Sequence, residues 1–167
     1  MRPIGGDFVL TDHFGRRASL ADYRGRFPLI FFGFSHCRVI CPRALTRLSA
    51  ALDRLGPSST AVHPLYITVD PERDTPAVLK SFLEAGFPRF LGLTGSREEI
   101  DIVKANYRVF ARRAGDAVDQ QGYAIAHTAF SYFIDPEGQY LTHFTDAIEE
   151  GVLAQELQRW IARYPQR

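Results

Sequence analysis

Residues 29–45 read LIFFGFSHCRVICPRAL, and this stretch decides the fold. Its first six residues form an apolar run with no polar side chain on either face, which is typical of a strand at the centre of a parallel sheet. The loop that follows carries the only two cysteines of the chain, Cys37 and Cys41, and Pro42 suits the first turn of a helix. Both thiols therefore follow the carboxyl end of a strand, where open α/β sheets place their ligands.

Length and composition indicate a soluble globular protein. The 167 residues are enough for one well-filled domain and few for two. A net charge of +1, from 20 basic and 19 acidic residues, gives no electrostatic case for a nucleic-acid partner. No apolar run approaches the ~18 residues of a membrane-spanning helix, and the first residues lack the apolar core of a signal peptide. We therefore expect either a cytosolic protein or a chain that lacks its targeting segment.

The remaining segments alternate between strand and helix patterns. Leucines at helical spacing after Pro42 predict a helix that ends at Gly56, and residues 65–69 predict the next strand. Further helices are predicted after Thr75-Pro76, after a capping box at Ser96 and Glu99, and after a second one at Asp146 and Glu149. Short strands are predicted at residues 8–10, 16–20, 90–93, 129–134 and 139–144, and residues 114–122 predict an exposed loop or hairpin tip.

This order predicts a single α/β domain over residues 1–167 with a thioredoxin-like fold. We expect a central mixed sheet flanked by helices, preceded by an N-terminal β-hairpin. No internal repeat or interdomain linker interrupts the pattern.

The spacing of Cys37 and Cys41 permits two kinds of chemistry. A thiol near a helix N-terminus has its thiolate favoured by the exposed N–H groups and the helix dipole, and Arg38 acts in the same direction. Two neighbouring thiolates serve either as a redox-active pair that forms a disulfide or as soft ligands for copper, zinc or iron. The structural alternative is two packed thiols, because unpaired cysteine is among the most buried residue types.

Two thiolates leave a metal site incomplete, and His127 is the candidate for the third ligand. It stands just before the predicted strand 129–134, and in a thioredoxin-like fold the loop before that strand lies against the dithiol loop. His36 diverges from its neighbour Cys37, whereas we expect His13, His63 and His143 to be exposed to solvent. A set of two Cys and one His with an open fourth position suits copper, and zinc in a catalytic-type site is also compatible.

Asp70, Arg73 and Asp74 form a second polar cluster after the strand 65–69. The structural interpretation is a turn before a helix, with Arg73 paired to a neighbouring carboxylate. A supporting or docking role is also open, because this turn follows a strand end and so shares the face of the dithiol loop.

With these residues in hand, the sequence resembles the SCO/SenC family, the copper-delivery proteins of cytochrome c oxidase assembly. The similarity covers nearly the whole chain. Its specific parts are GFSHC at residues 33–37 with Cys41-Pro42, VDPERDTP at residues 69–76, and His127-Thr128 followed by YFIDPEG at residues 132–138.

The resemblance implies a thioredoxin-like domain that holds copper, as Cu(I), Cu(II) or both, through Cys37, Cys41 and His127. It implies a metallochaperone whose partner is the copper-bearing subunit of cytochrome c oxidase or a similar acceptor. Members of the family usually carry an N-terminal membrane anchor and face the periplasm or the mitochondrial intermembrane space. The resemblance thus implies that an anchor is missing from these 167 residues.

The chain departs from the family pattern between the cysteines. Arg38-Val39 stands where the family typically has Pro-Asp, and Ala126 stands where many members have an acidic residue. Exchanging negative for positive charge beside the metal weakens Cu(II) more than Cu(I), because the interaction scales with the charge of the ion. The departure therefore predicts a preference shifted toward Cu(I), or toward dithiol redox chemistry.

Two alternatives of a different class remain open from the residues. A thiol–disulfide oxidoreductase that reduces the cysteines of a copper-site apoprotein would use the same two sulfurs, but it would not need His127. A peroxidase of the peroxiredoxin type fits less well, because Cys37 and Cys41 are too close for separated peroxidatic and resolving cysteines.

Overall fold

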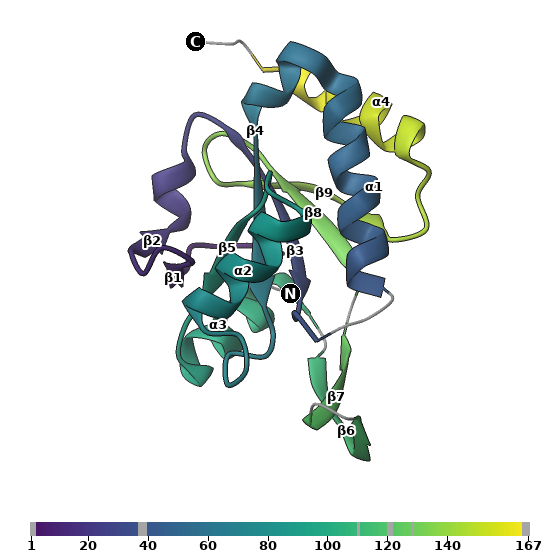
Figure 1. Cartoon of the computed structure of the whole chain (residues 1–167). Helices are drawn as coiled ribbons and strands as arrows, with labels where there is room; N and C mark the ends of the chain where they lie inside the picture. Colours follow the sequence, from purple (N-terminus) through teal and green to yellow (C-terminus); the bar gives the residue numbers. More distant parts are fainter. Residues whose placement is uncertain (1–2, 37–39, 110, 120–121, 128, 165–167) are drawn as a thin grey trace.

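A seven-stranded mixed sheet with helices on both faces forms the body of the protein (Figure 1). The computed structural model describes residues 3–36, 40–109, 111–119, 122–127 and 129–164, with backbone only at residues 40, 111–119 and 122–127. Cys37, Arg38 and Val39 lie outside the described residues.

The sheet is parallel at its centre and antiparallel toward its edges. Its order is β2-β1-β5-β4-β3-β8-β9, with β3 parallel to β4 and β4 parallel to β5, while β8 and β1 pair antiparallel to the central strands. The strands are β1 (Val9–Asp12), β2 (Arg17–Ser19), β3 (Phe27–Gly33), β4 (Val62–Thr68), β5 (Leu91–Thr94), β8 (Phe130–Ile134) and β9 (Tyr140–Thr145). The N-terminal hairpin of β1 and β2 and the mixed sheet flanked by helices are confirmed.

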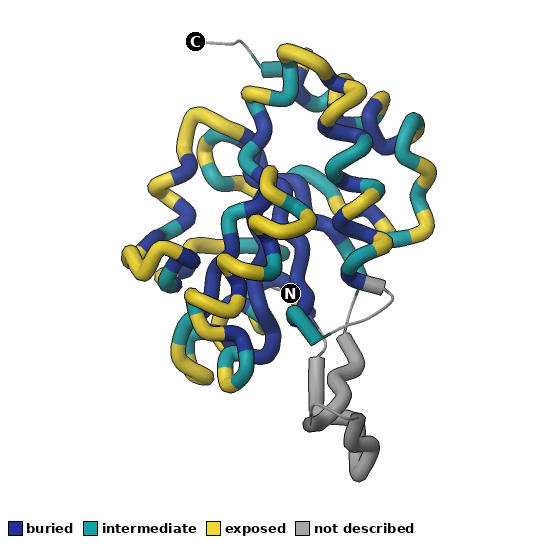
Figure 2. The backbone as a smooth tube through the Cα atoms, in the orientation of Figure 1, coloured by how far each residue is buried: buried dark blue, intermediate teal, exposed yellow. Residues whose placement is uncertain are grey.

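Strand β3 separates two cores because its side chains alternate between the faces of the sheet. Leu29 and Phe31 belong to one buried cluster, whereas Ile30 and Phe32 belong to the other. Figure 2 shows the central strands as a continuous buried tube with exposed segments around them. Burial on both faces explains the unbroken apolar run in the sequence.

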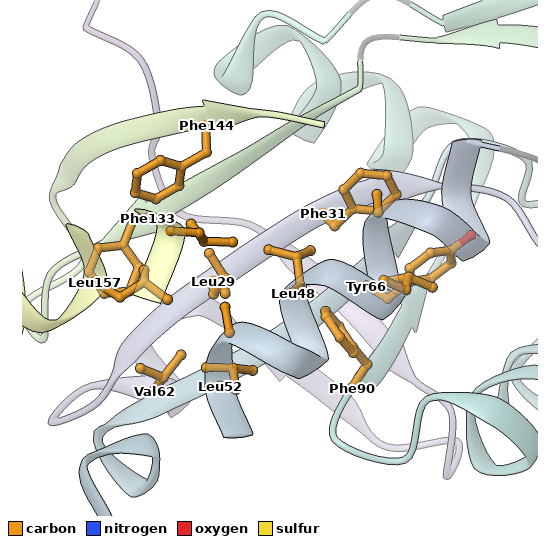
Figure 3. Packing of buried hydrophobic residues seen from close by; sticks show 14 of the residues in the cluster. Leu29, Phe31, Leu48, Leu52, Val62, Tyr66, Phe90, Phe133, Phe144 and Leu157 are labelled. Atoms are coloured by element: carbon orange, nitrogen blue, oxygen red, sulfur yellow. The ribbon is translucent and has the colours of Figure 1, made fainter. Parts of the chain in front are cut away.

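The helices divide between these two faces. Helices α1 (Ile40–Leu55), α2 (Pro76–Gly86) and α4 (Glu150–Ala162) contribute buried residues to the first cluster. Figure 3 shows Leu48 and Leu52 of α1 packed beside Leu29. Helix α3 (Arg97–Tyr107) joins the second cluster, together with the N-terminal hairpin and the 3-10 helix η1 (Leu20–Tyr23). A second 3-10 helix, η2 (Gly56–Ala61), follows α1.

Most predicted helix starts are confirmed, with one correction. Thr75 caps α2 by accepting a hydrogen bond from Val78, and Ser96 with Glu99 forms a complete capping box on α3. The predicted capping box at Asp146 is wrong. Glu149 itself caps α4, since its side chain accepts from the backbone N–H of Val152.

A second hairpin leaves the body of the protein. It consists of β6 (Ala111–Asp119) and β7 (Gly122–His127), which pair antiparallel with an irregularity between Arg113 and Val118. In Figure 1 it projects from the end of the sheet at which β3 leads toward α1. The expected loop or hairpin tip at residues 114–122 is thus part of a longer two-stranded hairpin.

Candidate metal centre

Cys41 lies in the first turn of α1 and is fully buried. The helix begins at Ile40, two residues before the start that Pro42 predicted, because Pro42 is equally acceptable within the first turn. Cys41 therefore lies in the first turn of the helix, whose backbone N–H groups have no acceptors within the helix. These groups and the helix dipole act in favour of a thiolate, whereas burial of Cys41 in the apolar cluster acts against it.

Gly33 makes room for the Cys41 side chain. A Cβ atom placed on Gly33 would lie 2.8 Å from Cys41 Sγ, 2.8 Å from Tyr66 Oη and 3.1 Å from Phe31 Cε1. The sulfur and the phenol oxygen are thus packed against the same point of β3, where any side chain would displace them. This close approach at the end of an apolar strand is a specific structural reason for glycine in the sequence GFSHC.

Asp74 connects the β4–α2 turn to the beginning of the cysteine loop. Its carboxylate accepts hydrogen bonds from the backbone N–H of Ser35 (3.0 Å), from the Ser35 hydroxyl and from the Thr68 hydroxyl (2.7 Å). Thr68 Oγ1 in turn accepts from the backbone N–H of Asp70 (2.9 Å). Burial raises the pKa of Asp74, and the hydrogen bonds from Ser35 and Thr68 oppose this shift.

Asp70 and Arg73 form an ion pair within the same turn. Arg73 Nε lies 2.5 Å from Asp70 Oδ2, and the carboxylate side chain is completely buried. The Arg73 guanidinium also lies over the Phe34 ring, 5.9 Å from its centroid. The predicted pairing of Arg73 with a neighbouring carboxylate is confirmed, and the turn does face the cysteine loop.

The register of the sheet brings the backbone of His127 to this end of the molecule. Strand β8 runs antiparallel to β3, with Leu29 opposite Phe133 and Phe31 opposite Ser131. The chain therefore enters β8 at Phe130 beside the carboxyl end of β3. His127 is the last residue of β7, and only two residues separate it from the start of β8. Its backbone pairs with Ala111, and its side chain lies outside the described residues.

The other histidines correct part of the sequence analysis. His13 is buried and accepts a hydrogen bond at Nδ1 from the backbone N–H of Gly92 (3.0 Å). His63 is half-buried in β4 with its ring 4.6 Å from that of Tyr23, and burial lowers its pKa to about 4. The expectation that both are exposed to solvent is therefore wrong. His143, on β9, is exposed as predicted.

The network around Asp74 could not be read from the sequence in this form. The pattern Asp-x-x-x-Asp after a strand indicated a polar turn, but nothing local indicated that Ser35 and Thr68 would share one carboxylate. Among the side chains that the structure describes, no three His, Cys, Asp or Glu residues cluster as metal ligands. Within the same part of the chain, no helix is both long and apolar enough to cross a membrane.

Comparison with known proteins gives a consistent answer. The sequence model of the SCO1/SenC family matches residues 1–162. The chain is 40% identical over 141 residues to an SCO2-like protein of Rickettsia felis, covering 84% of this chain and 69% of that protein. It is 37% identical over 153 residues to the mitochondrial SCO1 homolog of Homo sapiens, covering 90% of this chain and 50% of that protein.

Solved structures extend the match to the fold. ScoI of Bradyrhizobium japonicum with copper bound superimposes with a TM-score of 0.84 at 36% identity, covering 94% of this chain and 99% of that one. Yeast Sco1 with copper bound gives a TM-score of 0.89 at 34% identity, covering 98% and 91%. The predicted thioredoxin-like fold is thereby confirmed. On this sequence and structural evidence, the chain belongs to the SCO1/SenC family.

Proposed function

We propose that this protein is a copper-binding metallochaperone of cytochrome c oxidase assembly, which carries copper on Cys37, Cys41 and His127. In this proposal residues 1–167 act as one SCO/SenC domain, and the copper ion is cargo that passes to the copper-bearing subunit of the oxidase. The pairing of β3 with β8 is the observation that carries the proposal, since both the Ser35 end of the cysteine loop and the backbone of His127 lie beyond the same end of β3.

The chemistry of the donor set supports copper as the cargo. Cys41 lies in the first turn of α1, where backbone N–H groups without intrahelical acceptors can stabilise a metal-bound thiolate. Thiolate sulfur is a soft ligand that suits Cu(I), and imidazole suits both copper states. Relatives from a bacterium and from yeast, at 36% and 34% identity, have been solved with copper bound.

An incomplete ligand set suits transfer rather than storage. Three protein ligands leave a coordination position at which a thiolate or imidazole of the acceptor binds before the chaperone ligands leave. The ion then moves by stepwise ligand exchange and is never released into water. We place this exchange on the periplasmic side of a bacterial membrane, or in the mitochondrial intermembrane space of a eukaryote, because the relatives include bacterial and mitochondrial proteins.

Competition with a Cu(I)-specific chelator tests the ligand set. The reduced protein is titrated beside the variants Cys37→Ser, Cys41→Ser and His127→Ala, with His143→Ala as the matched control because His143 is exposed on β9. We expect each of the three variants to lose affinity by at least about 10-fold and the control to match the parent. Unchanged affinity in His127→Ala would remove that residue from the site.

The rival function is a thiol–disulfide oxidoreductase acting on the cysteines of a copper-site apoprotein. The location of Cys41 at a helix N-terminus is equally compatible with this function, because both chemistries use a thiolate at that place. His127→Ala separates the two. A chaperone loses copper binding while its dithiol reduction potential is unchanged, whereas a reductase that does not bind copper keeps its activity in the variant.

A further inference from the structure

The cysteine loop is held at its two ends by different parts of the fold. On the helix side, Cys41 is buried and its sulfur rests against Gly33. On the strand side, Ser35 precedes Cys37 by two residues and is tied to Asp74, which is 39 positions further along the chain. The described residues on both sides of the loop are thus attached to separate parts of the fold.

The attachment at Ser35 is made by one buried carboxylate. Asp74 is fully buried and accepts both the backbone N–H and the hydroxyl of Ser35, and it takes a third hydrogen bond from Thr68. Thr68 ends β4 and its oxygen also accepts from Asp70, so its single proton is directed to Asp74. The donors thus come from the end of β4 and from the first residues of the cysteine loop.

The rest of the turn holds Asp74 in place. Its backbone N–H donates to the carbonyl of Asp70 (2.9 Å), and Thr75, the next residue, caps α2. The backbone N–H of Val69 donates to the carbonyl of Gly33 (2.8 Å), which extends the contact between β3 and β4 up to the loop. The Ser35 hydroxyl also lies 3.3 Å from Nδ1 of His36, so the attachment continues to the residue before Cys37.

We propose that Asp74 is a positioning residue for the copper site: its carboxylate fixes Ser35 and His36, and thereby sets the approach of Cys37 to Cys41. The copper-binding part of this inference rests on the proposed function, but the positioning of the two thiols does not. Asp74→Ala removes all three acceptor contacts and leaves the Ser35 N–H without its buried partner. Asp74→Asn keeps an oxygen for the Ser35 N–H and Thr68, while its amide donates to the Ser35 hydroxyl after that hydroxyl rotates.

The first test measures how well the two thiols are held together in the metal-free protein. The chain is equilibrated in mixtures of reduced and oxidised glutathione, its thiols are alkylated, and the Cys37–Cys41 disulfide is quantified by mass spectrometry. We expect Asp74→Ala to lower the effective concentration of the thiols by about 10-fold or more, since small misplacements of paired groups are costly. Asp74→Asn is expected to stay within about threefold of the parent, the effect of one altered hydrogen bond.

The second test measures copper. Asp74→Ala is expected to lose about 10- to 100-fold in Cu(I) affinity and to shift the thiolate-to-Cu(II) absorption band, while Asp74→Asn retains both. Ser35→Ala removes only the hydroxyl contact and gives a smaller effect of the same sign, which keeps the test available if Asp74→Ala does not fold.

Asp135→Ala is the matched control. Asp135 is also a buried carboxylate that accepts two backbone N–H groups, from Glu137 and Gln139 (both 2.9 Å). It follows β8 at the end of the sheet opposite the cysteine loop, because β8 is antiparallel to β3. Its loss is expected to lower the melting temperature without changing the thiol or copper measurements.

Each outcome separates the two claims. A folded Asp74→Ala with unchanged thiol equilibrium overturns the positioning role, and so does an Asp74→Asn variant as impaired as Asp74→Ala. If the parent protein itself binds no copper, the proposed function fails, and the glutathione measurement alone then decides the role of Asp74.

Discussion

Gly33→Ala is expected to destabilise the fold and weaken copper binding through the same displaced atom. The new Cβ would lie 2.8 Å from both Cys41 Sγ and Tyr66 Oη, whereas ordinary contact begins at 3.4 Å. Sulfur and phenol must therefore each retreat by about 0.6 Å, in a core packed too densely to absorb the shift without strain. Cys41, Tyr66 and Phe31 are all fully buried, so none of them has open space to move into.

The magnitude follows from this crowding. Overpacking a buried site costs about 1–3 kcal/mol, and the lower chain entropy of alanine in the unfolded state offsets about 0.4–1 kcal/mol. We expect a net loss of roughly 1–2 kcal/mol in the free energy of unfolding. Because the displaced sulfur is a proposed copper ligand, we also expect about a 10-fold loss of Cu(I) affinity.

Urea unfolding of the reduced protein and chelator competition measure the two effects. Gly86→Ala is the matched control, because Gly86 ends α2 and a Cβ there would meet no atom within 4 Å. It is expected to be neutral or to stabilise by up to about 1 kcal/mol. Adding Tyr66→Phe to Gly33→Ala removes one of the clashing atoms, so the double variant is expected to recover part of the lost stability.

Two results would refute the reasoning. A Gly33→Ala protein as stable as the parent means that the sulfur is not seated against β3. A destabilised variant with unchanged copper affinity means that the position of Cys41 does not control the site.

Three further predictions concern pH, oxidation state and the buried ion pair. Burial lowers the pKa of His63 to about 4 in the folded protein, compared with about 6.5 in the unfolded chain. The free energy of unfolding therefore falls by up to about 3 kcal/mol as the pH drops from 6.5 through 4. Urea unfolding of His63→Gln over the same pH range should show a flatter profile. Arg38→Pro/Val39→Asp is expected to raise Cu(II) affinity relative to Cu(I), measured by titration with both copper states, because it replaces positive by negative charge beside the ion. Arg73→Met leaves the buried Asp70 carboxylate without its ion-pair partner and should cost about 3 kcal/mol in unfolding free energy.

Each of these three predictions is checked against a control variant or against the parent protein. His143→Gln is the same substitution at an exposed histidine and serves as the comparison for His63→Gln. Arg89→Met breaks an exposed pair with Asp53 and should cost less than about 1 kcal/mol. If the unfolding free energy of His63→Gln falls with pH as steeply as that of the parent, the interpretation of His63 is contradicted. Equal copper affinities in the Arg38/Val39 variant and its parent would contradict the charge argument. Equal losses of unfolding free energy in Arg73→Met and Arg89→Met would contradict the role of the buried ion pair.

The elements of this fold were predictable wherever local chemistry decides them. The apolar run at residues 29–34 becomes β3, the leucines after Pro42 line α1, and the caps at Thr75 and Ser96 form as expected. The start of α4 was misplaced because Glu149 is an uncommon cap that competes with the nearby Asp146 pattern. His13 and His63 were misjudged because burial in a turn or strand depends on what packs against it, here Gly92 and Tyr23.

The sequence predicts ligands for the candidate site, and these stay a prediction, but it does not predict the contacts that support the site. The sequence pointed to Cys37, Cys41 and His127 through spacing and resemblance, and to the Asp70–Arg73 turn through charge. The contact of Cys41 with Gly33 and the attachment of Ser35 to Asp74 join distant segments, and no periodicity or local motif encodes them.

X-ray absorption of the copper-loaded, reduced protein tests the central claim most directly. Counting the ligand atoms around Cu(I) should give two sulfurs and one nitrogen, with the nitrogen lost in His127→Ala. A shell made of sulfur alone in the parent would contradict the ligand set of Cys37, Cys41 and His127 and remove the histidine from the proposed route of transfer.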